Sequence, residues 1–158
     1  MIKKTSVGCI HPSSAFVLSK SDFKFYDPNI KKKPEAGDVV YGEVAYIGQH
    51  SSLENIYGRI HTIVDSKKSI FVFGNRYAPD YYESVIPEED LKEEYDLVAR
   101  SGIVSRVLTK NEKIKDPTKI KILGYVCDNQ GNVINTKNYQ KITLNKNNKN
   151  IRSKKNRS

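Results

Sequence analysis

The fold is decided by residues 37–80, which read GDVVYGEVAYIGQHSSLENIYGRIHTIVDSKKSIFVFGNRYAPD. This stretch contains three runs of β-branched and aromatic residues separated by two polar turns, and such a pattern predicts consecutive β-strands. Within residues 39–47, Gly42 indicates a bend or bulge of the kind that allows a sheet to close. Residues 70–73 form a short and wholly apolar run, which is typical of a strand buried on both faces.

The rest of the chain continues the alternation of strand and turn. We expect further strands at about residues 15–18, 57–64, 96–108, 119–127 and 133–136. One short helix is expected at residues 87–94, where Pro87 occupies the first turn and acidic residues follow it. The predicted fold class is therefore mainly β: a small closed or partly open antiparallel β-barrel with one short helix and a disordered basic C-terminal tail.

The net charge of +9 is concentrated at the C-terminus of the 158-residue chain. Residues 141–158 carry seven lysines and arginines and no acidic residue, which leaves only +2 on residues 1–140. Apolar residues almost vanish after residue 140, so we expect residues 1–140 to form one β-barrel domain and residues 141–158 a disordered tail. No apolar run approaches the roughly 20 residues that span a bilayer, and no signal-peptide core follows the N-terminal lysines. We therefore expect a soluble cytoplasmic protein without a membrane partner, in which Cys9 and Cys127 are reduced.

Motifs of several enzyme classes are missing from the sequence. It contains no Walker loop, no G-x-S-x-G nucleophile elbow, no G-x-G-x-x-G turn and no H-E-x-x-H pair. Cys9, His11 and Cys127 combine with His50 or His61 into four nominal zinc ligands, but no C-x-x-C pair organises them. We expect no metal, no cofactor and, in the simplest interpretation, no catalysis.

The densest group of recognition side chains lies at residues 75–83, where a guanidinium, a carboxylate and three tyrosines occur together. In one interpretation Arg76 binds a carboxylate or phosphate and the tyrosines provide stacking area. In the other, Arg76 pairs with Asp80 or Glu83 and the loop is structural. Arg100 has two interpretations as well: it faces the same end of the barrel as Arg76, or it is a solvated strand residue. The predicted binding residues are Gln49, His50, Asn75, Arg76, Tyr77, Asp80 and Arg100.

A nucleic-acid interface is the alternative that the basic residues suggest. Lysines and arginines neutralise phosphates, and aromatic side chains stack on bases. The predicted nucleic-acid contacts are Lys31, Lys32, Lys33, Lys149, Arg152, Lys154, Lys155 and Arg157.

Three segments carry a resemblance to known proteins: residues 40–55, the FVFGNRYAPDYYE loop at residues 71–83, and residues 99–106 with the later KDPT. Together they resemble the N-terminal module of a family of uncharacterised bacterial proteins, in which a small β domain precedes a P-loop NTPase domain. More distantly the chain is similar to the barrel of HerA-type translocases. The NTPase part does not follow in this sequence, so the resemblance implies a non-catalytic adaptor.

Three functions remain open at this point. The first is an interaction module that binds a protein partner, with an NTPase supplied by another chain as one such partner. The second is a nucleic-acid-binding barrel, which the net charge of +2 on residues 1–140 supports weakly. The third is an enzyme that uses His50, Arg76 and Asp80 on a small substrate.

Overall fold

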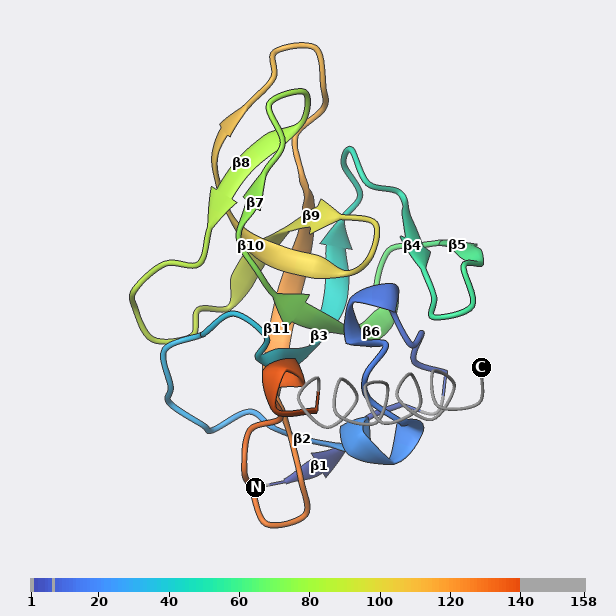
Figure 1. The fold of residues 1–158 in the computed structure, drawn as a ribbon, viewed down its shortest axis with the longest axis vertical. Helices are drawn as coiled ribbons and strands as arrows, with labels where there is room; N and C mark the ends of the chain where they lie inside the picture. Colours follow the sequence, from blue (N-terminus) through green and yellow to red (C-terminus); the bar gives the residue numbers. More distant parts are fainter. Residues whose placement is uncertain (1, 7, 140–158) are drawn as a thin grey trace, which may run out of the picture.

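The computed structural model describes residues 2–6 and 8–139, which fold mainly as β-strands (Figure 1). Two 3₁₀ helices, η1 (Ser13–Ala15) and η2 (Lys20–Phe23), lie near the N-terminus. The strands are β1 (Lys3–Lys4), β2 (Phe25–Asp27), β3 (Val39–Tyr46), β4 (Ser52–Glu54), β5 (Ile60–Thr62), β6 (Lys68–Phe73), β7 (Arg76–Tyr77), β8 (Tyr82–Val85), β9 (Glu94–Ala99), β10 (Ile103–Lys110) and β11 (Thr118–Cys127).

Five of these strands close into a ring of hydrogen bonds. β3 pairs with β6 and with β11, β9 pairs with β10 and with β11, and β6 pairs with β10. All of these pairings are antiparallel except the parallel pairing of β6 with β10. Closure leaves no free strand edge in the ring, which confirms the expectation of a small β-barrel.

The other strands extend the sheet beyond the ring. β2 continues it from β11 and carries β1, whereas β8 continues it from the second half of β10 and carries β7. β4 and β5 form a separate two-stranded ribbon beside the barrel (Figure 1). β10 therefore belongs to the ring at its start and to the outer ribbon of β7 and β8 at its end.

Both faces of β3 and β6 are buried. Val40, Val44, Phe71 and Phe73 pack with apolar residues of β9, β10 and β11 inside the ring. The alternate residues of the same two strands pack outside it against η1, η2 and the end of β11. This arrangement confirms the prediction that residues 70–73 form a strand buried on both faces.

Gly42 allows β3 to approach its neighbour closely. A Cβ atom at this position would lie 2.6 Å from Cγ2 of Ile120. Of the two register shifts between β3 and β11, the one beside Gly42 lies on β11, between Ile122 and Gly124. The predicted irregularity is thus present in this pair of strands, although the additional residue belongs to β11.

The predicted helix at residues 87–94 does not form. These residues make a loop, and β9 begins at Glu94. Leu91 packs against the barrel core, the amide of Leu91 donates to the carbonyl of Lys32 at 3.2 Å, and the amide of Lys92 donates to the hydroxyl of Tyr95 at 3.0 Å. Because a helix this short has little intrinsic stability, these tertiary contacts determine the conformation.

Two of the short strand predictions were also wrong. Residues 15–18 form turns that continue from η1, in which the amide of Ala15 donates to the carbonyl of Pro12. Residues 133–136 return beside β11 as predicted, but they make only two isolated bridges, Cys127 with Val133 and Asp38 with Asn135. The described α-helical residues are 136–139.

Two further expectations from the sequence concern the membrane and the C-terminal tail. No helix within residues 2–6 and 8–139 is long and apolar enough to cross a membrane. The predicted basic tail at residues 141–158 lies outside the described residues.

Candidate functional site

Four of the predicted binding residues meet in one hollow of about 370 Å³. We call it the arginine hollow. Its lining residues come from the connection between β3 and β4, from β4, from β7 and the turn that follows it, and from the turn between β9 and β10. They are Gln49, His50, Ser51, Ser52, Arg76, Tyr81 and Arg100.

The β3 to β4 connection is fixed by Thr118, which is fully buried at the start of β11. The amide of Gly48 donates to Oγ1 of Thr118 at 2.8 Å, and that hydroxyl donates to the carbonyl of His50 at 2.6 Å. A Cβ atom at residue 48 would lie 2.1 Å from the carbonyl oxygen of Asp116, so only glycine fits this close approach. The wall that carries His50 is therefore held by the chain before β11.

Gln49 has a positioning role rather than a free side chain. Its Oε1 accepts a hydrogen bond from the backbone amide of Lys115 at 2.9 Å, and the backbone amide of Gln49 donates to the carbonyl of Asp116 at 2.9 Å. Both bonds join the hollow to the segment that precedes β11.

Arg76 is half-buried and held from two sides. Its Nη1 donates to the carbonyl of Val98 on β9, and its Cζ lies 5.7 Å from the ring centroid of Tyr81. Within the described residues it forms no ion pair with Asp80 or Glu83. The guanidinium is thus oriented while its charge stays uncompensated.

Arg100 brings a second guanidinium to the hollow. Its carbonyl accepts a hydrogen bond from the amide of Glu54 at 2.8 Å, which attaches the β9 to β10 turn to β4. The side chain is exposed and, in the part of the chain that the structure describes, makes no hydrogen bond or ion pair. Among the described lining residues none is acidic, so two positive charges converge without a carboxylate. Such an arrangement attracts anions.

His50 contributes a buried ring nitrogen to the wall of the hollow. Its ring stacks on Tyr81 with centroids 6.1 Å apart and meets the edge of Tyr82 at 5.9 Å. Its Nε2 is shielded from solvent and has no hydrogen-bond partner among the described residues. Burial, together with the nearby charges of Arg76 and Arg100, lowers the pKa of His50 from 6.5 to about 4. The imidazole is therefore neutral at pH 7.

Three of the predicted binding residues do not line the arginine hollow. Asn75 accepts a hydrogen bond from the amide of Ile86 at 2.8 Å and so stabilises its own loop. Tyr77 is 75% exposed and lines a smaller neighbouring hollow of about 220 Å³, which Tyr81 separates from the first. Asp80 is exposed in the β7 to β8 turn and lines neither hollow.

Three lining residues were missing from the predicted set. Ser51 and Ser52 follow His50 directly, and Tyr81 is one of the three tyrosines in the 75–83 loop. In the sequence these residues are neighbours of predicted binding residues, which was the only indication of their role. Which side each one faces depends on the pairing of β4 and β8 with other strands.

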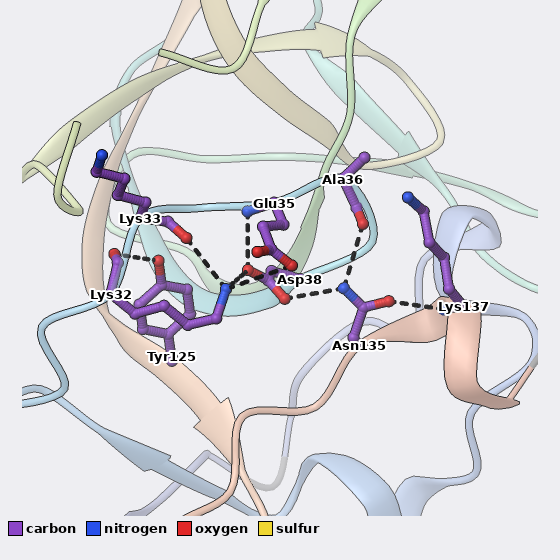
Figure 2. A network of polar contacts seen from close by, with 8 residues as sticks. All are labelled: Lys32, Lys33, Glu35, Ala36, Asp38, Tyr125, Asn135 and Lys137. Atoms are coloured by element: carbon purple, nitrogen blue, oxygen red, sulfur yellow. Dashed lines mark hydrogen bonds and ion pairs between the residues drawn. The ribbon is translucent and has the colours of Figure 1, made fainter. Parts of the chain in front are cut away.

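The lysines at residues 31–33 have different surroundings. Lys32 forms an ion pair with Asp38, in which its Nζ lies 2.6 Å from a carboxylate oxygen (Figure 2). Asp38 is buried, with only 1% of its surface exposed. The same carboxylate accepts hydrogen bonds from the amide of Glu35 at 2.8 Å and from Nδ2 of Asn135 at 2.9 Å. The carbonyl of Lys32 accepts a hydrogen bond from the hydroxyl of Tyr125 at 2.7 Å.

This network compensates a buried negative charge and ties three distant segments together (Figure 2). Lys32 is thus held within the fold, whereas Lys31 and Lys33 are exposed. The other predicted nucleic-acid contacts lie outside the described residues.

The nominal zinc ligands are dispersed over the fold. Nε2 of His11 lies 2.7 Å from the carbonyl of Ala15, and Nε2 of His61 lies 2.9 Å from the side-chain amide of Asn55. Among the described residues no group of three or more histidine, cysteine, aspartate or glutamate side chains is arranged to hold a metal ion. Cys127 is a buried core residue, as its apolar surroundings in the sequence predict.

Comparison with protein-family models, with curated proteins and with solved structures found no match for this chain. The arginine hollow is therefore interpreted from its own geometry and charge.

Proposed function

We propose that this protein is a non-enzymatic interaction module that binds an anionic group of a protein partner in the arginine hollow. The observation that carries the proposal is the convergence of Arg76 and Arg100 on a hollow without an acidic lining residue. Guanidinium groups bind carboxylates and phosphates through paired, charge-assisted hydrogen bonds, and such contacts are strong when they are partly shielded from water.

The distribution of charge on the barrel favours a protein over a nucleic acid. Residues 1–140 carry a net charge of only +2. Several basic side chains of the body pair with acids: Lys32 with Asp38, Arg106 with Glu89, Lys110 with Asp116 and Lys119 with Asp96. A polynucleotide needs a row of uncompensated cations along its backbone, whereas one anionic group needs a single focus of charge.

Exposed side chains on the outer ribbon are of the kinds found in protein interfaces. Tyr77 on β7, Val85 on β8 and Leu108 on β10 belong to the same ribbon and are 75%, 37% and 58% exposed. Tyrosine and arginine are enriched in protein–protein interfaces and often dominate their binding energy. The ribbon that carries Arg76 therefore also offers exposed apolar contact area.

The enzymatic alternative receives no support from this geometry. Asp80 does not line the hollow, and His50 is a weak base because its pKa is lowered to about 4. A general base works best when its pKa lies near the working pH.

The test is capture of a partner from the source cell, with nuclease treatment and with matched arginine variants. Arg100→Gln removes a guanidinium that has no contact within the described fold, and Arg59→Gln, on the exposed β4 to β5 turn, is its control. We expect a protein that stays bound after nuclease treatment, is lost with Arg100→Gln and is retained with Arg59→Gln. ATPase activity in the captured material would identify an NTPase partner. Release by nuclease, or capture that neither Arg76 nor Arg100 affects, would refute the proposal.

A further inference from the structure

We infer that the arginine hollow takes a phosphorylated side chain, that is, a phosphate monoester on a serine or threonine of the partner. This inference rests on the proposed function and specifies the chemical group that the hollow recognises.

The number of uncompensated charges favours a dianion. Arg76 and Arg100 both face the hollow, and none of the described residues that line it is acidic. A phosphate monoester carries about −1.5 to −2 at neutral pH, whereas a carboxylate carries −1. A carboxylate would leave one guanidinium charge unmatched, so the monoester is the better complement for the pair.

The number of hydrogen-bond donors points the same way. Arg76 uses one nitrogen on the carbonyl of Val98 and keeps its other donors, while the whole guanidinium of Arg100 is available. The hydroxyls of Ser51 and Ser52 also line the hollow and make no side-chain hydrogen bond within the described residues. Three phosphate oxygens accept more hydrogen bonds than the two oxygens of a carboxylate.

The single compact hollow favours a protein-borne phosphate over a nucleic-acid backbone. Backbone phosphates are diesters that carry one charge each and repeat along the strand, so they are best met by many separate cations. The hollow instead has two guanidiniums in its lining and shares Tyr81 with the smaller hollow that Tyr77 lines. A peptide that carries the phosphate would extend past Tyr81 into the smaller hollow.

His50 provides a local readout of occupancy. The charged and titratable groups around its ring are Arg76, Arg100, Tyr81 and Tyr82, and burial, followed by the charges of Asp116 and Asp96, raises the pKa of Tyr82 to about 12. Tyr82 is therefore neutral at pH 7. A bound dianion would offset the two guanidiniums, so the titration midpoint of His50 should rise.

The experiment uses NMR titration of the full chain with three small probes: blocked phosphoserine, blocked glutamate and a 5′-phosphorylated dinucleotide. We expect blocked phosphoserine to shift the amide signals of residues 49–52, 76 and 100 in a saturable way and to raise the His50 midpoint. Blocked glutamate should bind at least about tenfold more weakly, and Arg100→Gln should weaken phosphoserine binding about 10-fold to 100-fold, because charge-assisted hydrogen bonds are lost. Arg59→Gln should bind normally, and the spectra of both variants should report an unchanged fold.

The outcomes separate this inference from the proposed function. Equal binding of glutamate and phosphoserine, both sensitive to Arg100→Gln, would overturn the phosphate inference and leave the proposed function standing. Tighter binding of the dinucleotide than of phosphoserine would overturn the choice of a protein-borne phosphate. If no probe shifts the hollow while partner capture still depends on Arg100, the inference also fails. Partner capture that is independent of both arginines would refute the proposed function itself.

Discussion

Replacing Thr118 by valine removes a hydroxyl that holds the wall of the arginine hollow while keeping the size of the side chain. The hydroxyl accepts from the amide of Gly48 and donates to the carbonyl of His50, so the substitution leaves two partly buried backbone groups without partners. Each such loss costs about 1 to 1.5 kcal/mol, at the lower end of the range for buried groups. We therefore expect the free energy of unfolding to fall by about 2 to 3 kcal/mol, which corresponds to a decrease in Tm of about 5 to 10 °C.

Chemical denaturation and a thermal scan measure this loss directly. Thr109→Val is the matched control, because its hydroxyl donates to a carboxylate oxygen of Glu83 at 3.2 Å on the exposed ribbon. The control should change stability by less than about 0.5 kcal/mol. The amide signals of residues 49–52 should move in the Thr118 variant and not in the control. A Thr118→Val protein as stable as the control, with unchanged signals at these residues, would refute the argument that Thr118 positions the hollow.

Three further predictions concern charge. Asp38→Asn should lower the free energy of unfolding by about 3 kcal/mol, because it leaves the Lys32 ammonium without its buried counterion, whereas the exposed Asp65→Asn should have little effect in the same denaturation assay. Because the pKa of His50 is lowered in the fold, the unfolded chain binds the proton more readily, and the free energy of unfolding should fall as the pH decreases from about 6.5 to about 4. His50→Gln should flatten this part of a plot of the denaturation midpoint against pH. Deletion of residues 141–158 should abolish most nucleic-acid binding and leave Tm unchanged, and the slope of log K against log salt concentration should decrease in magnitude by about 0.7 to 0.9 for each lost phosphate contact. Binding that persists without the tail would place nucleic-acid recognition on the barrel.

The local pattern of the sequence predicted the strands of the ring well, because residues that alternate or cluster in short apolar runs have few other ways to be buried. It failed at residues 87–94, where a proline and several acids indicated a helix. There the burial of Leu91 and the hydrogen bond to Tyr95 outweigh the weak preference of a short segment. Propensity is decisive only where tertiary contacts do not oppose it.

The role of Lys32 shows a second limit of the sequence. Three consecutive lysines suggest an exposed basic contact, and two of them are exposed. The middle one, Lys32, pairs with the buried carboxylate of Asp38, which also accepts a hydrogen bond from Asn135, 97 positions away along the chain. The need of this carboxylate for a counterion becomes evident only when the positions of the segments that carry Asp38 and Asn135 are known.

The arginine hollow was predicted in its chemistry but not in its geometry. Arg76 begins β7 and Arg100 lies in the turn after β9, so 24 positions of sequence separate them and the local pattern does not show that they meet. Arg76 is tied to this part of the fold by its hydrogen bond to the carbonyl of Val98 on β9, two residues before Arg100. The turn that carries Arg100 is attached to β4, because the carbonyl of Arg100 accepts a hydrogen bond from the amide of Glu54. Arg76 is therefore oriented by the fold before an anion arrives, whereas the exposed side chain of Arg100 becomes ordered only on binding, and the entropy lost there offsets part of the binding energy.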